Sequence, residues 1–595
     1  MNKAVDDKHA GKTDTSPRLW EQWAESAWGR YWLDWQRRMW SELPLSRLFP
    51  LDPAEVFRAW TEFSETLAAQ PALLDRQLSL LALEQLRLGL WATRQLSGDL
   101  APAPVPAPTR DRRYSDEDWE TALPFNVLRL SHLLWSRWLS DTASRLDLDA
   151  STRQRVRFYL RQWLDALSPS NFPVTNPQVV RETIASAGEN LRRGLSNLLA
   201  DAGQGAISVV PPARFRAGEN LALTPGQVVL RNELMELIQY APATRKTFAV
   251  PLLILPPWIN RYYVLDIRPG MSLVEYLVAQ GHTVYMVSWR NPDASQADVE
   301  LEDYLRLGAL AAMKAAKSIT GSRKVNVVGY CIGGTLLGIM LAHLAAKGDG
   351  SVASATFLTT LLDFSEVGET AVFIDRQQLA EVQRRMEEKG YLAPEELSAV
   401  FRMMRSNDLI WNFVVNNYLL GREPPAFDLM HWSVDGTRLP RAMQEYYLYN
   451  MYVRNNLSKP GALTLLGTPI DLGRIRCPAY FVAGAEDHIV PWQTAYRSAR
   501  LVPGAARFVL GRAGHITAVV CPTGGRRNQY MVGDCAQSDP DAWLAAHAQS
   551  REGSWWPDWI KWLATRSGGK QAPPPLGNRR HPPLMAAPGQ YVLDE

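Results

Sequence analysis

The sequence predicts an α/β fold with a mainly parallel sheet, preceded by a mostly helical N-terminal domain. Three observations support this prediction. Helical patterns dominate before about residue 220, short Val- and Ile-rich runs alternate with helical patterns after it, and one long helical or irregular segment interrupts that alternation. Strands that alternate with helices are typical of a parallel sheet covered by helices on both faces.

Composition excludes several classes of protein. The chain has 595 residues, enough for more than one domain, and an ordinary globular balance of 46% hydrophobic and 21% charged residues. A net charge of +3 is too small to indicate nucleic acid or an anionic membrane as partner. The four cysteines form no CxxC pair, which disfavours a zinc ribbon. A polar start without the apolar run of a secretory signal predicts a cytoplasmic protein with free thiols.

The predicted division of the chain has five parts. Residues 1–100 form a helical, Trp-rich region, and 101–109 (APAPVPAPT) form a proline-rich linker that we expect to be extended and mobile. Residues 110–215 continue the helical domain, and 216–562 form the catalytic α/β domain. The Pro- and Gly-rich tail, 563–595, is expected to be loosely ordered.

Aromatic residues crowd one face of the first predicted helix. Two interpretations stay open: a helix docked on its own core, or an aromatic surface that meets a hydrophobic particle or a partner. The residues on this face are Trp20, Trp28, Tyr31, Trp32 and Trp35.

Apolar runs bounded by turn residues predict the strands of the sheet. The expected strands are 250–255, 282–288, 324–328, 352–358, 478–484 and 506–510, with helices over 272–280, 302–319 and 332–346. Residues 327–346 lack charge and imitate a membrane span, but a glycine cluster divides them into a buried strand, a turn and a helix. The long insertion before residue 478 predicts a helical cap over about 362–460.

Cys331 stands where a catalytic nucleophile is expected. Gly329-Tyr330-Cys331-Ile332-Gly333 follows a predicted strand and opens a helix, which is the context of the G-x-S-x-G nucleophile elbow of the α/β-hydrolase fold. The turn aims the positive end of the helix at the sulfur and favours its thiolate.

The acid and the base follow in the order of that fold. Asp487 comes just after the strand 478–484, and His515 comes just after the last strand. His515 would deprotonate Cys331, and Asp487 would orient the imidazole or interact with the substrate hydroxyl. His488 as the base and Asp363 as the acid are the weaker alternatives.

The oxyanion donors are predicted from the same fold. The Ile332 N–H lies just after the nucleophile, and the loop 256–260 supplies the second backbone donor from Trp258 or Ile259, of which Ile259 is preferred. Trp258 and Asn260 are predicted to contact the substrate. A cysteine nucleophile forms a thioester close in energy to an acyl-CoA, so the chemistry indicates an acyltransferase or a thioesterase.

Many separate motifs resemble bacterial polyhydroxyalkanoate synthases of the single-subunit class I type. They span about residues 110–562: SNFPVTNP, PPWINRYYVLDIRP, GHTVYMVSWRNP, GYCIGG, TTLLDF, NDLIWN, FDLMHW, AEDHIVPW, AGHI and GSWWPDW. The resemblance implies polymerisation of (R)-3-hydroxyacyl-CoA, with 3-hydroxybutyryl-CoA as the expected substrate, through Cys331, Asp487 and His515. One departure is Cys521, where the family more often has Asn.

The resemblance also implies the setting of the enzyme. It implies a homodimer related through the cap, with Trp432 linked to its contacts, and a structural role for Asp266. It implies residence on cytoplasmic polymer granules beside phasin-type proteins, and no metal or redox cofactor. An acyl-CoA thioesterase or esterase of the same fold and a catalytically silent granule-binding protein remain the alternatives.

Overall fold

The computed structural model describes residues 53–97, 101–106, 111–211, 214–374, 376–504, 506–525, 528–547 and 549–594, with Ser26 and Leu48 besides. The chain divides into two compact units, Met1–Ser208 with Arg405–Pro424 and Val209–Met404 with Pro425–Glu595. The predicted aromatic face between Trp20 and Trp35 lies outside the described residues.

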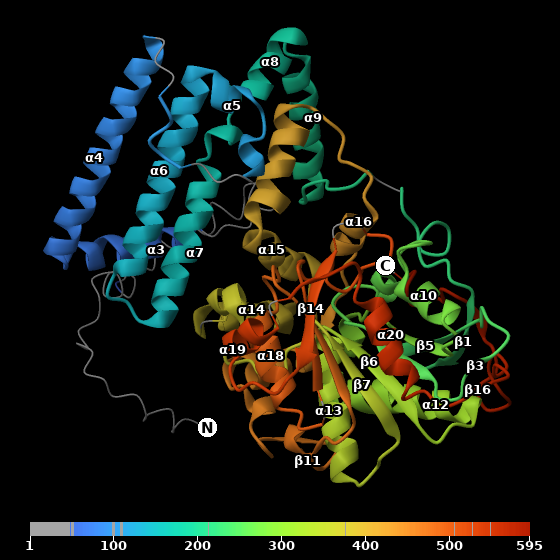
Figure 1. Cartoon of the computed structure of the whole chain (residues 1–595). Helices are drawn as coiled ribbons and strands as arrows, with labels where there is room; N and C mark the ends of the chain where they lie inside the picture. The colour runs from blue at the N-terminus through green and yellow to red at the C-terminus, as the bar shows by residue number, and fades with distance from the viewer. Residues whose placement is uncertain are drawn as a thin grey trace. The chain divides into compact units, whose positions relative to one another are not determined.

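The first unit is helical (Figure 1). Its principal helices are α3 (Pro53–Ala68), α4 (Pro71–Leu96), α6 (Leu123–Arg145), α7 (Ala150–Ala166), α8 (Pro177–Ala185) and α9 (Glu189–Gln204), with η8 (Asn407–Trp411) and η9 (Val414–Leu419) from the insertion. Side chains at their starts explain why helices begin there. The Asp149 carboxylate accepts the Thr152 N–H, and the Asn176 side chain accepts the N–H groups of Gln178 and Val179.

The described part of the proline-rich linker is packed rather than mobile. Val105 is buried in a cluster with Leu88 and Trp91 of α4. The Trp91 indole also donates a hydrogen bond to the Ala101 carbonyl at 2.9 Å. The expectation of an extended, mobile linker is therefore wrong for residues 101–106, because a tertiary contact covers the apolar residue among the prolines.

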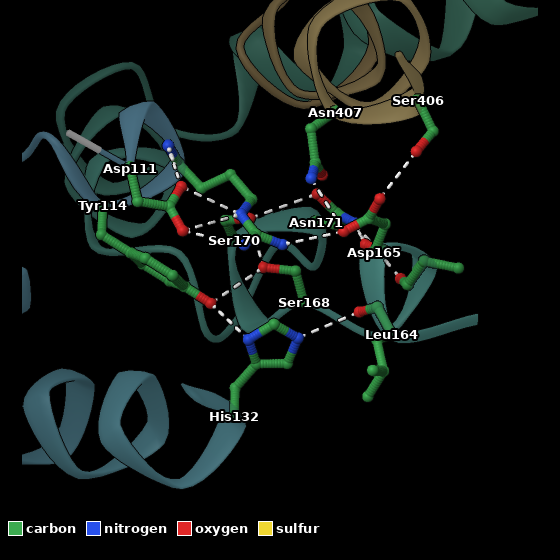
Figure 2. Close-up of polar contacts among 12 residues, drawn as sticks. Asp111, Tyr114, His132, Leu164, Asp165, Ser168, Ser170, Asn171, Ser406 and Asn407 are labelled. Carbon is green, nitrogen blue, oxygen red and sulfur yellow. Dashed lines mark hydrogen bonds and ion pairs between the residues drawn. The ribbon is translucent and has the colours of Figure 1, made fainter. Parts of the chain in front are cut away.

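A buried polar network joins part of the insertion to this helical unit (Figure 2). At the end of α7, the Asp165 carboxylate accepts hydrogen bonds from Ser406 and Asn407, both at 2.7 Å, and pairs with Arg113 at 3.2 Å. Residues 405–424 therefore belong to the helical unit, whereas the sequence placed the whole of 362–460 in one cap.

The second unit is built on an eleven-stranded sheet of order β15-β14-β13-β12-β7-β6-β4-β5-β2-β1-β17. Six neighbouring strands run parallel: β5 (Val284–Trp289), β4 (Leu252–Leu255), β6 (Val325–Tyr330), β7 (Val352–Leu358), β12 (Ala479–Gly484) and β13 (Ala506–Gly511). They are the six predicted strands. The others pair antiparallel at the two sides: β1 (Gly226–Arg231), β2 (Met235–Tyr240), β14 (Gln529–Asp534), β15 (Arg551–Glu552) and β17 (Met585–Ala586).

Helices cover both faces of the sheet (Figure 1). On one face α12 (Ala311–Thr320), α13 (Ile332–Ala346) and α18 (Trp492–Arg500) share a core with alternate strand residues such as Leu253 and Val327. On the other face α10 (Leu273–Ala279) and α20 (Trp556–Ala564) pack with the intervening residues such as Ile254 and Val328. This alternation is the two-residue period of a strand buried on both sides.

The uncharged segment 327–346 is divided as expected into β6 and α13. Among the described helices, none combines the length and the apolar character that a bilayer crossing requires. Between β7 and β12 lies the helical insertion, whose elements in this unit include α14 (Arg376–Lys389), α15 (Pro394–Met404), α16 (Asp428–Val434), α17 (Arg441–Tyr447) and η10 (Leu448–Val453).

The C-terminal tail is part of the folded unit. Residues Lys570–Gln571 (β16) pair with Thr247–Phe248 (β3), and β17 extends the main sheet beside β1. The expectation of loose order is therefore wrong. The proline and glycine content of the tail suppresses helices, but it leaves the backbone free to bond to strand edges.

Candidate active site

Cys331 occupies a strained turn between β6 and α13. Its backbone angles are φ 53° and ψ −122°, a conformation rarely taken by residues other than glycine. The flanking glycines are required by close approach: a Cβ on Gly329 would lie 2.5 Å from the Gly334 Cα, and one on Gly333 would lie 2.2 Å from the Leu255 carbonyl oxygen. The sequence around Cys331 thus permits a turn that places the sulfur at the carboxyl edge of the sheet.

Asp487 and His515 meet at the same edge. Asp487 follows β12 and His515 follows β13, and the His515 Nδ1 lies 2.7 Å from one Asp487 carboxylate oxygen. The other carboxylate oxygen accepts the N–H groups of Ile489 and Val490, both at 2.9 Å. These bonds orient the carboxylate, and the contact at Nδ1 leaves Nε2 of the imidazole available to Cys331.

The electrostatics of the three residues are coupled. Burial alone would lower the pKa of His515, but the Asp487 carboxylate and a hydrogen-bonded Cys331 sulfur outweigh it and raise that pKa to about 10. The structure thus brings all three residues of the predicted triad together, and its electrostatics favour the charged form of His515.

Aromatic residues that the sequence analysis did not single out lie near the sulfur. Burial raises the pKa of Tyr447 and of Tyr452 above the usual range, and for both tyrosines the Cys331 sulfur adds to the effect. The Tyr447 hydroxyl donates to Thr335 Oγ1 at 3.2 Å, and Phe364 packs against both tyrosine rings. The sequence feature that could have indicated these residues is the cluster of tyrosines in QEYYLYNMY, residues 444–452.

The predicted oxyanion and substrate residues occupy two different settings. Ile332 is the first residue of α13, so its N–H is at the helix N-terminus beside Cys331. The side chain of Trp258 is buried against Trp289 and Tyr304. The side chain of Asn260 donates to the Trp432 carbonyl at 3.3 Å, and so contacts the insertion.

The Ile259 backbone also contacts the insertion, since its carbonyl accepts the Thr437 N–H at 2.9 Å.

Asp363, the alternative acid, has structural partners. Asp363 accepts the Ser365 N–H at 2.9 Å and the Asn455 side-chain amide at 2.8 Å, so it caps a loop after β7. The Asp487 carboxylate accepts hydrogen bonds from the N–H groups of Ile489 and Val490 and contacts Nδ1 of His515.

Asp266 and Trp432 are both buried. Asp266 accepts hydrogen bonds from Thr224 and Ser272, and burial raises its pKa to about 6 in spite of these bonds. The Trp432 indole donates to the Arg261 carbonyl at 2.6 Å.

Within the described ranges, no cluster of three or more His, Cys, Asp or Glu side chains could hold a metal ion.

Comparison with known proteins adds two family matches and relatives that cover most of the chain. Residues 110–277 match the family described as "Poly-beta-hydroxybutyrate polymerase (PhaC) N-terminus", and residues 250–520 match "alpha/beta hydrolase fold". The "Poly(3-hydroxyalkanoate) polymerase subunit PhaC" of Cupriavidus necator is 45% identical over 499 residues, 82% of this chain and 84% of the relative. The "Poly(3-hydroxyalkanoate) polymerase" of Methylorubrum extorquens is 41% identical over 548 residues, 90% of each chain.

Solved structures with a distant likeness include a lipase. The monoacylglycerol lipase of Paleococcus ferrophilus shares 12% identity with a TM-score of 0.28, over 54% of this chain and 97% of the lipase. The family match and the mainly parallel sheet establish the α/β-hydrolase fold that the sequence predicted.

Proposed function

Since this chain belongs to the polyhydroxyalkanoate synthase family, class I, we propose that it carries the growing chain as a covalent thioester on Cys331. The enzyme is an acyltransferase that polymerises hydroxyalkanoate units into a polyester. The observation that supports the covalent route is the meeting of Cys331, His515 and Asp487 at the carboxyl edge of the sheet.

The first half-reaction loads the enzyme. The Cys331 thiolate attacks the thioester carbonyl of a 3-hydroxyacyl-CoA, and the backbone N–H groups of Ile332 and Ile259 stabilise the oxyanion. The bond from the carbonyl carbon to the CoA sulfur breaks, and the His515 imidazolium gives its proton to that sulfur. An acyl-cysteine and free CoA are left.

The second half-reaction forms the ester bond. Neutral His515 takes the proton from the hydroxyl of a 3-hydroxyacyl-CoA, and the oxygen attacks the acyl-cysteine carbonyl. The carbon–sulfur bond to Cys331 breaks as the new ester bond forms, and the thiolate and the imidazolium are restored. Asp487 orients the ring and stabilises its charged form.

The substrate, the partners and the setting belong to the same proposal. Trp258 and Asn260 contact the substrate, and short acyl chains such as 3-hydroxybutyryl are preferred. The chain works as a homodimer on cytoplasmic polymer granules with phasin-type proteins, and it uses no metal or redox cofactor. Residues 1–215 and 216–562 are its two functional parts, and the tail 563–595 is docked on the second.

Replacement of the nucleophile tests the proposal. With 3-hydroxybutyryl-CoA, Cys331→Ala is expected to lower CoA release by about 10⁴-fold or more, because the triad acts as a unit. Cys477→Ala is the matched control, since burial raises the pKa of the Cys477 thiol to about 11 and keeps it protonated. CoA release that survives Cys331→Ala would refute the nucleophile assignment.

The product distinguishes the alternatives. An insoluble polyester supports the polymerase, and soluble 3-hydroxy acids would instead indicate a thioesterase or esterase. Absence of any CoA release from the unaltered protein would favour a catalytically silent granule-binding protein.

A further inference from the structure

The loop after β4, residues 256–261, is held by one short segment of the insertion. Thr437 donates through its N–H to the Ile259 carbonyl at 2.9 Å and through its hydroxyl to the Trp258 carbonyl. Asn260 pairs with Gly436 in an isolated antiparallel bridge. The backbone that surrounds the Ile259 N–H is therefore fixed by residues 436–437.

Arg261 extends this attachment to the end of the chain. Its Nε donates to the Asp435 carboxylate at 3.1 Å, its Nη1 donates to the Tyr591 carbonyl at 2.9 Å, and its Nη2 donates to the Asp594 carbonyl. The Arg261 side chain is only 7% exposed. A planar guanidinium can bond in several directions at once, so this one joins the insertion to the C-terminal residues.

The C-terminal residues are themselves attached to the sheet. The carboxylate of Glu236, a fully buried residue of β2, accepts the N–H groups of Gln590 at 2.9 Å and Tyr591 at 3.0 Å. The Tyr591 hydroxyl donates to the Asn232 carbonyl at 2.6 Å. Arg261 is therefore joined to β2 of the sheet through the C-terminal residues that it contacts.

We infer that Arg261 is a positioning residue for acyl transfer, which fixes the loop bearing the Ile259 N–H between Asp435 and residues 591–594. This inference rests on the proposed function, because the role of Ile259 as an oxyanion donor belongs to that proposal. The negative charge on the carbonyl oxygen develops only in the transition state. A displaced donor therefore slows acyl transfer and leaves substrate binding nearly unchanged.

The test separates acyl transfer from the reactivity of the thiolate. Arg261→Met removes the three donors and keeps an unbranched side chain. It is expected to lower kcat for CoA release about 10- to 100-fold, with KM within about threefold. Alkylation of Cys331 by iodoacetamide forms no oxyanion, so its rate is expected to stay unchanged. Arg261→Lys, which retains the charge but only a single donor centre, is expected to fall between the two proteins.

Arg268→Met is the matched control. Arg268 also pairs with a carboxylate of the insertion, Asp428, but its side chain is half exposed and bonds neither to the loop nor to the C-terminal residues. Its kcat is expected to equal that of the unaltered protein. Deletion of residues 589–595 is expected to lower kcat as Arg261→Met does, and the two changes together are expected to have no larger effect than either alone.

Three results would overturn the inference: an unchanged kcat in Arg261→Met, an equal loss in Arg268→Met, or a parallel fall in alkylation and CoA release. If Arg261→Met does not fold, Asp435→Asn weakens the same attachment from the other side and is judged by the same ratio of rates. CoA release that persists in Cys331→Ala would instead contradict the proposed function.

Discussion

Asp165 in the helical unit and Asp487 in the sheet unit are both buried carboxylates. Asp487 contacts His515 directly, and the polar network around Asp165 includes His132 (Figure 2). Asp165 accepts from Arg113, Ser406 and Asn407 (Figure 2). Asp487 accepts from two backbone N–H groups and from His515. The Asp165 network joins three segments of chain, whereas the Asp487 contact orients one ring.

The two histidines show the difference more clearly. Both nitrogens of His132 have partners, the Tyr114 hydroxyl at 2.8 Å and the Leu164 carbonyl at 2.9 Å (Figure 2). His515 uses one nitrogen for Asp487 and leaves the other for Cys331, which sits on strained backbone. A histidine whose two ring nitrogens both have fixed partners stabilises a fold. A reactive site needs, in addition, a histidine nitrogen directed at a nucleophile.

The largest expected effect is on catalysis and compares the same substitution at both carboxylates. Asp487→Asn is expected to lower kcat for CoA release by about 10³- to 10⁴-fold, since the amide does not stabilise the imidazolium. Asp165→Asn is expected to change kcat by less than about threefold, because its side-chain bonds go to Arg113, Ser406 and Asn407 and not to the triad. Initial rates with 3-hydroxybutyryl-CoA measure both, and comparable losses would remove the distinction between the two sites.

A smaller effect is expected on stability, with the order reversed. Asp165→Asn weakens charge-assisted bonds in the helical unit, and we expect a loss of about 2 kcal/mol there. Amide hydrogen exchange in residues 150–171 and 405–411 reports local opening of this unit without assuming a single unfolding transition. Faster exchange in these segments for Asp487→Asn than for Asp165→Asn would contradict the comparison.

The smallest expected effect is the pH dependence of stability, which has opposite signs at the two histidines. The pKa of His515 is raised to about 10, so its charged form stabilises the fold below about pH 6.5, and this contribution is lost as pH rises toward 10. Burial lowers the pKa of His132, so its neutral form stabilises the fold above about pH 6.5, and that contribution is lost as pH falls.

Thermal unfolding of two variants measures this difference. The gap in Tm between the unaltered protein and His515→Gln is expected to narrow from pH 6 to pH 10. The gap for His132→Gln is expected to widen from pH 5 to pH 7.5. Gaps that change in the same direction would show that the two rings are held in the same charge state.

The elements whose pattern is local could be predicted from the sequence. The six continuous apolar runs form the six parallel strands. A strand buried on both faces is apolar along its whole length, so it can be recognised from its own residues alone. The glycines at 329 and 333 marked the turn at Cys331, because no larger residue fits there. The order of strand ends predicted that Asp487 and His515 lie at the same edge of the sheet, and their side chains lie 2.7 Å apart there.

Which distant polar groups bond to one another could be seen only in the folded chain. The antiparallel strands β1, β2 and β14 and the docking of the tail depend on pairing between distant segments of backbone, which leaves little trace in local hydrophobicity. Residues 405–424 belong to the helical unit because Asp165 supplies acceptors for Ser406 and Asn407. The Asn260 side chain is likewise an amide donor, and the fold brings the Trp432 carbonyl within its reach. A buried donor takes whichever acceptor the fold brings within reach, and the sequence does not specify that partner.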